Sequence, residues 1–200
     1  QAGHGVFEMA SDMTPAEDEF MWMKELSAET GLPVTYALLQ SPVDSEKWRD
    51  MLALTDQARK QGANVTAQIA CRPTGMVLGW QSTIHPFVSR PTYMALARLP
   101  FAERLVELKK PDVRDAILAD KPKDMGVLGM IMTQGYDRMF RLDQGGKLDY
   151  EPAADDSVAA LAKSTNANPA AIVYDMLMEN DGRGYIYLPL LNYTKFNFDH

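Results

Sequence analysis

Three short apolar runs recur at regular intervals in the first part of the chain. They cover residues 6–11, 34–39 and 65–71, and their starts lie about thirty residues apart. Short apolar runs bounded by turn residues are typical of buried strands. The pattern therefore predicts three β-strands, with boundaries uncertain by about two to four residues.

A helical pattern separates each pair of these strands. Thr14-Pro15-Ala16-Glu17 is a helix start, and we expect a helix over residues 15–30 that ends at Gly31. A second helix is expected over residues 45–61, from an apolar stripe formed by Trp48, Met51, Leu52, Thr55 and Ala58. Alternating strands and helices predict a right-handed βαβαβ unit, with a parallel sheet covered on both faces and these two helices on one side.

Beyond residue 75 the spacing changes. Short helical segments are punctuated by prolines 91, 100, 111 and 122, and a further strand is expected near residues 185–191. A connection this long between strands is typical of a cap or lid. We therefore divide the chain into middle βα units (1–75), a helical lid excursion (76–184), and a returning strand with the start of the next unit (185–200).

Composition narrows the class of partner. The chain is 46% apolar and 24% charged, with a formal net charge of −7, and Lys109-Lys110 is its longest basic run. This balance argues against binding to nucleic acid or to an anionic membrane and favours a small-molecule partner. No stretch is long and apolar enough for a membrane span, and one cysteine, Cys71, excludes an internal disulfide. A cytoplasmic location is the default expectation.

Candidate site residues follow the predicted strands, because ligands of parallel α/β sheets bind at the carboxyl ends of the strands. Arg72 offers a planar cationic fork for a substrate carboxylate, or a salt bridge to a neighbouring loop. Asp12 is a substrate contact or base, or a favourable charge before a helix N-terminus. Gln40 is a hydrogen-bonding group at the pocket rim, or a partner for loop backbone. Asn192 follows the last predicted strand.

His85 is the histidine farthest from both ends of the chain. Its neighbour Pro86 fixes a loop conformation that can aim the imidazole inward, toward a substrate. The three histidines and Cys71 have no spacing typical of zinc ligands, so we expect no metal site formed by this chain. Cys71 itself is typical of an inert buried thiol.

The blocks GVFEMASD (5–12), PVTYALLQ (33–40) and VTAQIACRPTG (65–75) resemble successive strands of N-acyl-D-amino-acid deacylase-like amidohydrolases. HPF (85–87) and residues 185–193 fit the same family, so the resemblance spans nearly the whole chain. It implies an α/β fold that is part of a metal-dependent TIM-type (β/α)8 barrel. It also implies zinc or a similar divalent metal in the full-length parent, hydrolysing the amide bond of an N-acyl amino acid or related small amide.

The resemblance also implies which residues this chain lacks. The family's early histidine pair and its late aspartate would lie outside these 200 residues, and Ala10 and Leu38 match its two middle-strand histidines. We therefore expect an internal fragment that is inactive alone and depends on the remainder of its own barrel. The alternative is a non-catalytic α/β module that binds a ligand or partner at the same strand ends.

Overall fold

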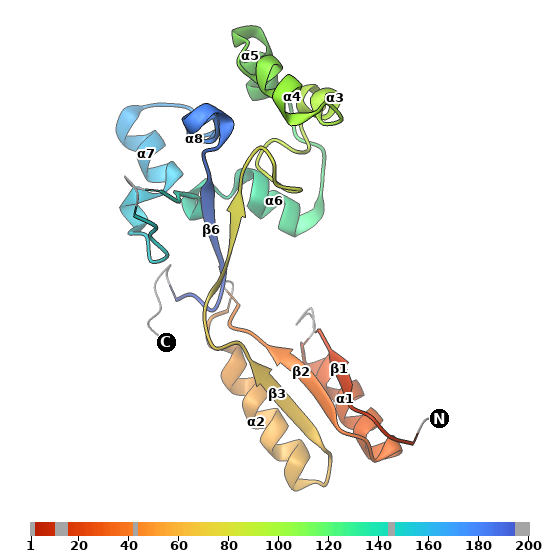
Figure 1. The fold of residues 1–200 in the computed structure, drawn as a ribbon. Helices are drawn as coiled ribbons and strands as arrows, with labels where there is room; N and C mark the ends of the chain where they lie inside the picture. The colour runs from red at the N-terminus through yellow and green to blue at the C-terminus, as the bar shows by residue number, and fades with distance from the viewer. Residues whose placement is uncertain (1–2, 11–15, 42–43, 144–146, 195–200) are drawn as a thin grey trace. The chain divides into compact units, whose positions relative to one another are not determined.

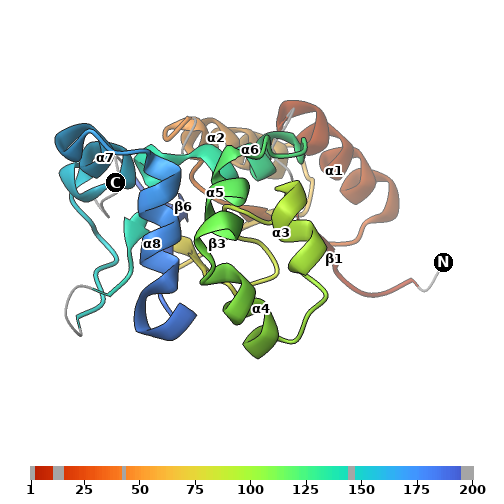
Figure 2. The same cartoon turned by 90° about the horizontal axis from the view of Figure 1, so that it is seen from above.

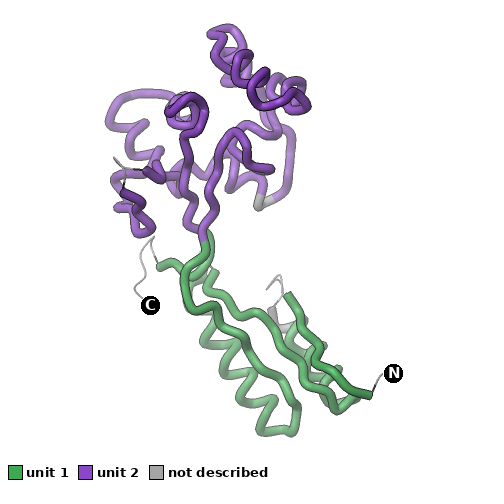
Figure 3. Tube along the Cα trace, in the orientation of Figure 1, with its two compact units in different colours: residues 1–74, 190–194, 198–200 green, residues 75–189, 195–197 purple. Residues whose placement is uncertain are grey.

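The computed structural model describes residues 3–10, 16–41, 44–143 and 147–194. The chain divides into two compact units, coloured separately in Figure 3. Unit 1 takes its described residues from 1–74 and 190–194, and unit 2 is formed by residues 75–189. Each unit has its own hydrophobic cluster.

Unit 1 is built on a parallel three-stranded sheet with the order β1-β2-β3 (Figure 1). The strands are β1 (Phe7–Met9), β2 (Val34–Leu38) and β3 (Val65–Ile69). β2 pairs with β1 on one side and with β3 on the other, and both pairings are parallel. The expectation of three adjacent parallel strands is confirmed.

Two helices pack against one face of this sheet. They are α1 (Ala16–Thr30) and α2 (Lys47–Lys60), close to the predicted ranges. Alternate β2 residues point to this face, and they join helix residues in one buried cluster that includes Phe20, Met23, Val34, Tyr36, Leu38, Met51 and Ala58. The prediction that both helices lie on one side is confirmed.

The opposite face of the sheet differs from the expectation of a sheet covered on both sides. Among the described residues on this face, Glu8, Thr66 and Gln68 are exposed. The reason is visible in the strand sequences VTYAL and VTAQI, in which every second residue is polar or small. Such alternation is typical of a sheet with one buried face.

The second sheet has the order β4-β6-β5. Its strands are β4 (Thr74–Leu78), β5 (Phe140–Arg141) and β6 (Ile186–Leu191), with β5 and β6 antiparallel. The sequence predicts β6 but as a strand returning to the first sheet, and it misses β4 and β5. β6 pairs with β4 in this sheet, and a Cβ at Gly75 of β4 would meet the ring of Tyr187 on β6.

Three helices of unit 2 begin at prolines. Pro91, Pro111 and Pro169 each occupy the first turn of a helix, and the Asn168 side chain accepts a hydrogen bond from the Ala170 N–H (2.9 Å). In Figures 1 and 2, α3, α4 and α5 lie beside one another. The α-helices of this unit are α3 (Pro91–Leu96), α4 (Phe101–Leu108), α5 (Pro111–Ala119), α6 (Gly126–Gln134), α7 (Val158–Thr165) and α8 (Pro169–Gly182).

Two methionines of α1 provide a matched test of the unit 1 core. Met23 is 0% exposed and Met21 is 46% exposed. We expect Met23→Ala to lower the free energy of unfolding by about 2–5 kcal/mol, because it leaves a cavity in the cluster. Met21→Ala should change it by less than about 0.5 kcal/mol. Native-state hydrogen exchange of the β2 and β3 amides measures both, and equal losses would contradict the assigned buried face of α1.

Candidate functional site

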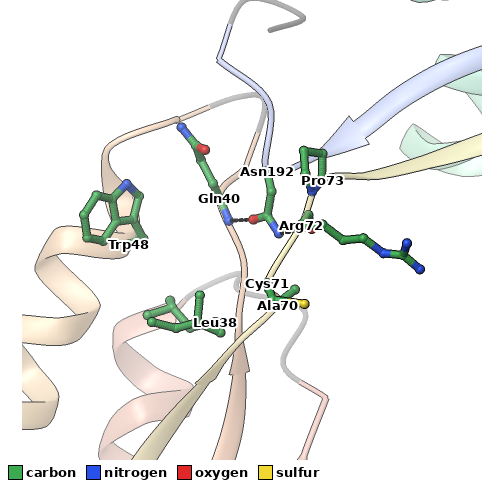
Figure 4. Close-up of a pocket in the computed structure, with 9 residues that line it drawn as sticks. Leu38, Gln40, Trp48, Ala70, Cys71, Arg72, Pro73 and Asn192 are labelled. Atoms are coloured by element: carbon green, nitrogen blue, oxygen red, sulfur yellow. Dashed lines mark hydrogen bonds between the residues drawn. The ribbon is translucent and has the colours of Figure 1, made fainter. Parts of the chain in front are cut away.

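A cavity lies at the carboxyl ends of β2 and β3, which meet at one edge because the strands are parallel (Figure 4). Its volume is about 580 Å³, within the range of about 300–1,000 Å³ common for small-molecule sites. The polar residues in its lining are Gln40, Cys71, Arg72 and Asn192. The larger part of the lining is apolar and consists of Leu38, Trp48, Ile69, Ala70 and Pro73.

Asn192 joins the two strand ends. Its Oδ1 accepts a hydrogen bond from the Gln40 N–H (2.7 Å), and its own N–H donates to the Gln40 carbonyl (3.0 Å). Its Nδ2 donates to the Arg72 carbonyl at 3.2 Å. Asn192 has a φ of +59°, and asparagine is one of the few residues that tolerate this left-handed conformation. The side chain thus acts as a cross-link between the segments that follow β2 and β3.

Gln40 is buried, with 7% of its surface exposed. Its Nε2 donates to the Thr194 hydroxyl at 2.8 Å, so this amide is also held within the strand-end network. Both Gln40 and Asn192 lie where the sequence places them, beside one cavity. The Asn192 side chain bonds to the backbone of Gln40 and Arg72, and the Gln40 side chain bonds to the Thr194 hydroxyl, which leaves the apolar side chains as the main contact surface for a ligand.

Arg72 lies at the cavity, but its guanidinium extends away from the Gln40–Asn192 pair (Figure 4). The residue is exposed, and its carbonyl rather than its side chain bonds to Asn192. The guanidinium that is predicted to bind a substrate carboxylate therefore lies at the cavity rim, in contact with solvent. A charge pair formed there is weaker than one formed in a buried site.

The other two candidates are not part of this cavity as described. Asp12 lies outside the described residues. His85 belongs to unit 2, where it is 0% exposed and packs edge-on against Trp80 and Tyr93, with ring centroids 5.2 and 4.4 Å away. Its ring does point inward, but into a hydrophobic core, and its Nδ1 accepts a hydrogen bond from the Phe87 N–H (3.2 Å).

Trp48 and Cys71 are the cavity residues that the sequence does not identify. Trp48 belongs to the apolar stripe of α2, and the stripe predicts only a place in the core. In the structure it both packs against the unit 1 cluster and lines the cavity. Cys71 is exposed, contrary to the expectation of a buried thiol. Its position directly after β3 is the signal that places it at the strand ends.

The donor chemistry of the cavity does not fit a divalent metal. Over the described ranges, no group of three or more histidine, cysteine, aspartate or glutamate side chains is placed to hold a metal ion. Zinc sites commonly need three or four ligands of these kinds, and among the lining residues Cys71 alone is of such a kind. Leu38, which the family resemblance would align with a metal-binding histidine, is part of the apolar lining.

Comparison with known proteins gives no match from which the role of this site could be inferred. The chain matches no protein-family model, no curated protein and no solved structure. Within the part of the chain that the structure describes, every helix is too short or too polar to cross a membrane.

Asn192 offers a direct test of the strand-end network. Asn192→Gly keeps the backbone free to adopt a positive φ but removes the acceptor of the Gln40 N–H. We expect the hydrogen-exchange protection of the Gln40 amide to fall by about tenfold or more, since a lost buried hydrogen bond costs about 1–3 kcal/mol. Thr194→Val, which leaves that acceptor in place, is the control. Unchanged protection in Asn192→Gly would contradict the cross-link.

His85 predicts a pH dependence of stability in unit 2. Burial, with a smaller effect of the Arg104 charge, lowers the pKa of His85 from 6.5 to about 3. The unfolded chain therefore binds a proton below pH 6.5 that the folded chain does not bind until near pH 3. Stability should be fully present above pH 6.5 and fall by about 1.4 kcal/mol per pH unit below it.

The measurement is urea unfolding between pH 6.5 and 5, followed by the fluorescence of Trp80 after Trp22 and Trp48 are replaced by phenylalanine. His85→Phe should flatten the pH dependence, whereas replacing the exposed His4 with glutamine should preserve it. The same slope in His85→Phe as in the parent protein would show that other groups cause it.

Proposed function

We propose that unit 1 is the substrate-binding part of an amidohydrolase that acts on an N-acyl amino acid or a related small amide. The observation that carries this proposal is the cavity at the carboxyl ends of β2 and β3, with its apolar lining beside the Gln40–Asn192 amides and Arg72 at the rim. An N-acyl amino acid has two complementary parts, an apolar acyl chain and a carboxylate. The acyl chain accounts for the apolar wall, and Arg72 attracts the carboxylate.

The winding of unit 1 supports the barrel that the family resemblance implies. Each strand pairs with the strand before it, and α1 and α2 both lie on one face. Successive units of a (β/α)8 barrel have this arrangement, and one βαβαβ half of a doubly wound sheet shares it. Residues 76–184 serve as the lid in this proposal.

Bond cleavage is assigned to the full-length parent, not to this chain. The described residues do not fit the metal that the family uses, so the contribution of this chain is to bind and orient the substrate. The isolated chain is proposed to bind ligand without hydrolysing it. Its partners are a small cytoplasmic acyl amino acid or amide and the remainder of its own barrel.

A non-catalytic binding module is the second candidate, favoured by the lack of a metal-ligand group among the described residues. The two proposals differ in what the full-length parent contains. Stoichiometric zinc together with amide turnover supports the amidohydrolase. A metal-free parent that binds acyl amino acids without turnover supports the binding module.

Cys71 allows ligand binding to be measured without engineering a probe. It is the single cysteine of the chain, it is exposed, and it lines the cavity. We expect saturating N-octanoylglycine to slow alkylation of Cys71 by iodoacetamide at least severalfold, because the acyl chain covers the thiol. Octylamine, which has the same chain length but neither amide nor carboxylate, should protect less. Alkylation at the unliganded rate up to the solubility limit of N-octanoylglycine would overturn the proposal.

Arg72 provides the charge-dependent arm of the same experiment. Arg72→Ala should weaken protection by N-octanoylglycine by less than about fivefold, because an exposed charge pair contributes about 0.2–1 kcal/mol. Arg72→Lys keeps the charge and is the matched control. Loss of the difference between these variants at high salt would identify the effect as electrostatic.

A further inference from the structure

Among the described residues that line the unit 1 cavity, Trp48 is the one with an aromatic side chain. It lies in the first turn of α2, directly beside the carboxyl ends of the strands, and it is partly buried against the unit 1 cluster. An aromatic ring offers about 150–250 Å² of surface, more than any aliphatic side chain in the lining. The position of the indole therefore strongly affects the shape of the apolar wall.

A neighbouring charged pair is placed to hold this indole. The guanidinium carbon of Arg49 lies 4.3 Å from the centroid of the Trp48 ring, in a cation–π arrangement. The Arg49 Nε donates to Glu46 Oε2 at 2.6 Å, so the guanidinium is itself fixed from the residue that precedes α2. Arg49 and Glu46 are well exposed, and neither lines the cavity.

Arg49 covers one face of the indole ring. That contact limits the orientations that the ring can adopt and presents the remaining surface to the cavity and the core. Leu38 is almost completely buried in the same cluster, so it forms the rigid part of the wall. Trp48, at a helix end and partly exposed, is the part whose position depends on a specific neighbour.

We propose that Trp48 determines which acyl groups the cavity accepts, and that Arg49 and Glu46 are positioning residues that hold the indole against the acyl chain. This proposal rests on the function proposed above, because it assumes that the acyl chain occupies this cavity. Each methylene removed from water adds about fourfold to affinity. A wall formed by Leu38 and Trp48 therefore favours longer acyl chains over acetyl.

The test compares Cys71 protection by N-acetylglycine, N-butanoylglycine and N-octanoylglycine, all without a stereocentre. In the unsubstituted chain, the apparent dissociation constant should fall with acyl length. Trp48→Ala should reduce the acetyl-to-octanoyl ratio of dissociation constants by about tenfold or more, because the aromatic part of the apolar wall is lost. Trp48→Phe keeps an aromatic wall and should preserve most of the ratio.

The positioning role has a separate readout. In chain labelled with 5-fluorotryptophan, the ¹⁹F line of Trp48, assigned by its loss in Trp48→Phe, should shift with N-octanoylglycine but not with N-acetylglycine. Arg49→Gln and Glu46→Gln should each shift or broaden this line without ligand and reduce the selectivity ratio about two- to fivefold. Arg49→Lys keeps a cation over the ring. It should therefore change the ¹⁹F line and the selectivity ratio less than Arg49→Gln does.

The outcomes separate this proposal from the one on which it rests. If N-octanoylglycine fails to protect Cys71 in the unsubstituted chain, the ligand class is wrong and both proposals are overturned. If it protects, but Trp48→Ala leaves the selectivity ratio within twofold, binding in the cavity stands and the role of Trp48 is overturned. Hydrogen-exchange protection of the β2 and β3 amides that persists in Trp48→Ala shows that a lost ratio does not come from a failure to fold.

Discussion

Parallel pairing of β2 with both of its neighbours is the constraint on which the site depends. The pairing brings the carboxyl ends of β2 and β3 to one edge, so Gln40 and Arg72 become neighbours although all of α2 separates them in the sequence. The same geometry starts α2 at that edge and places Trp48 there. A cavity at two strand ends and a helix start is thus a consequence of the winding: Leu38, Trp48 and Ile69 belong to regular elements, and the other lining residues belong to the segments that follow the strands.

Polar and apolar residues have different roles at this edge of the sheet. Asn192 and Gln40 satisfy each other and the adjacent backbone, which is the requirement for polar groups that lose contact with water. The apolar side chains have no such internal partners on the cavity side. Ligand affinity at such a site comes mainly from apolar burial, and the amide network maintains the shape of the wall.

Much of unit 1 could be predicted from the sequence, because its pattern is periodic and its contacts follow from strand winding. For this reason the sequence also predicts that Gln40, Arg72 and Asn192 lie near one another, and all three line the cavity. The partner of β6 could not be predicted, because β4 lies more than a hundred residues away in the chain and no local pattern specifies such a pairing. Nor could the environment of His85, since Pro86 restricts the loop without specifying which cluster receives the ring. The exposed face of the first sheet could be predicted, because the alternating polar residues of β2 and β3 indicate it.

The two hydrophobic clusters share no residue: one contains Phe20, Tyr36 and Met51, and the other contains Trp80, Phe87 and Tyr174. Cooperativity arises within a continuous core, so each unit has the means to open as a separate foldon. A melting curve recorded from a signal in one core then describes that unit alone. For this molecule, a single midpoint temperature has meaning only together with the location of the reporter that produced it.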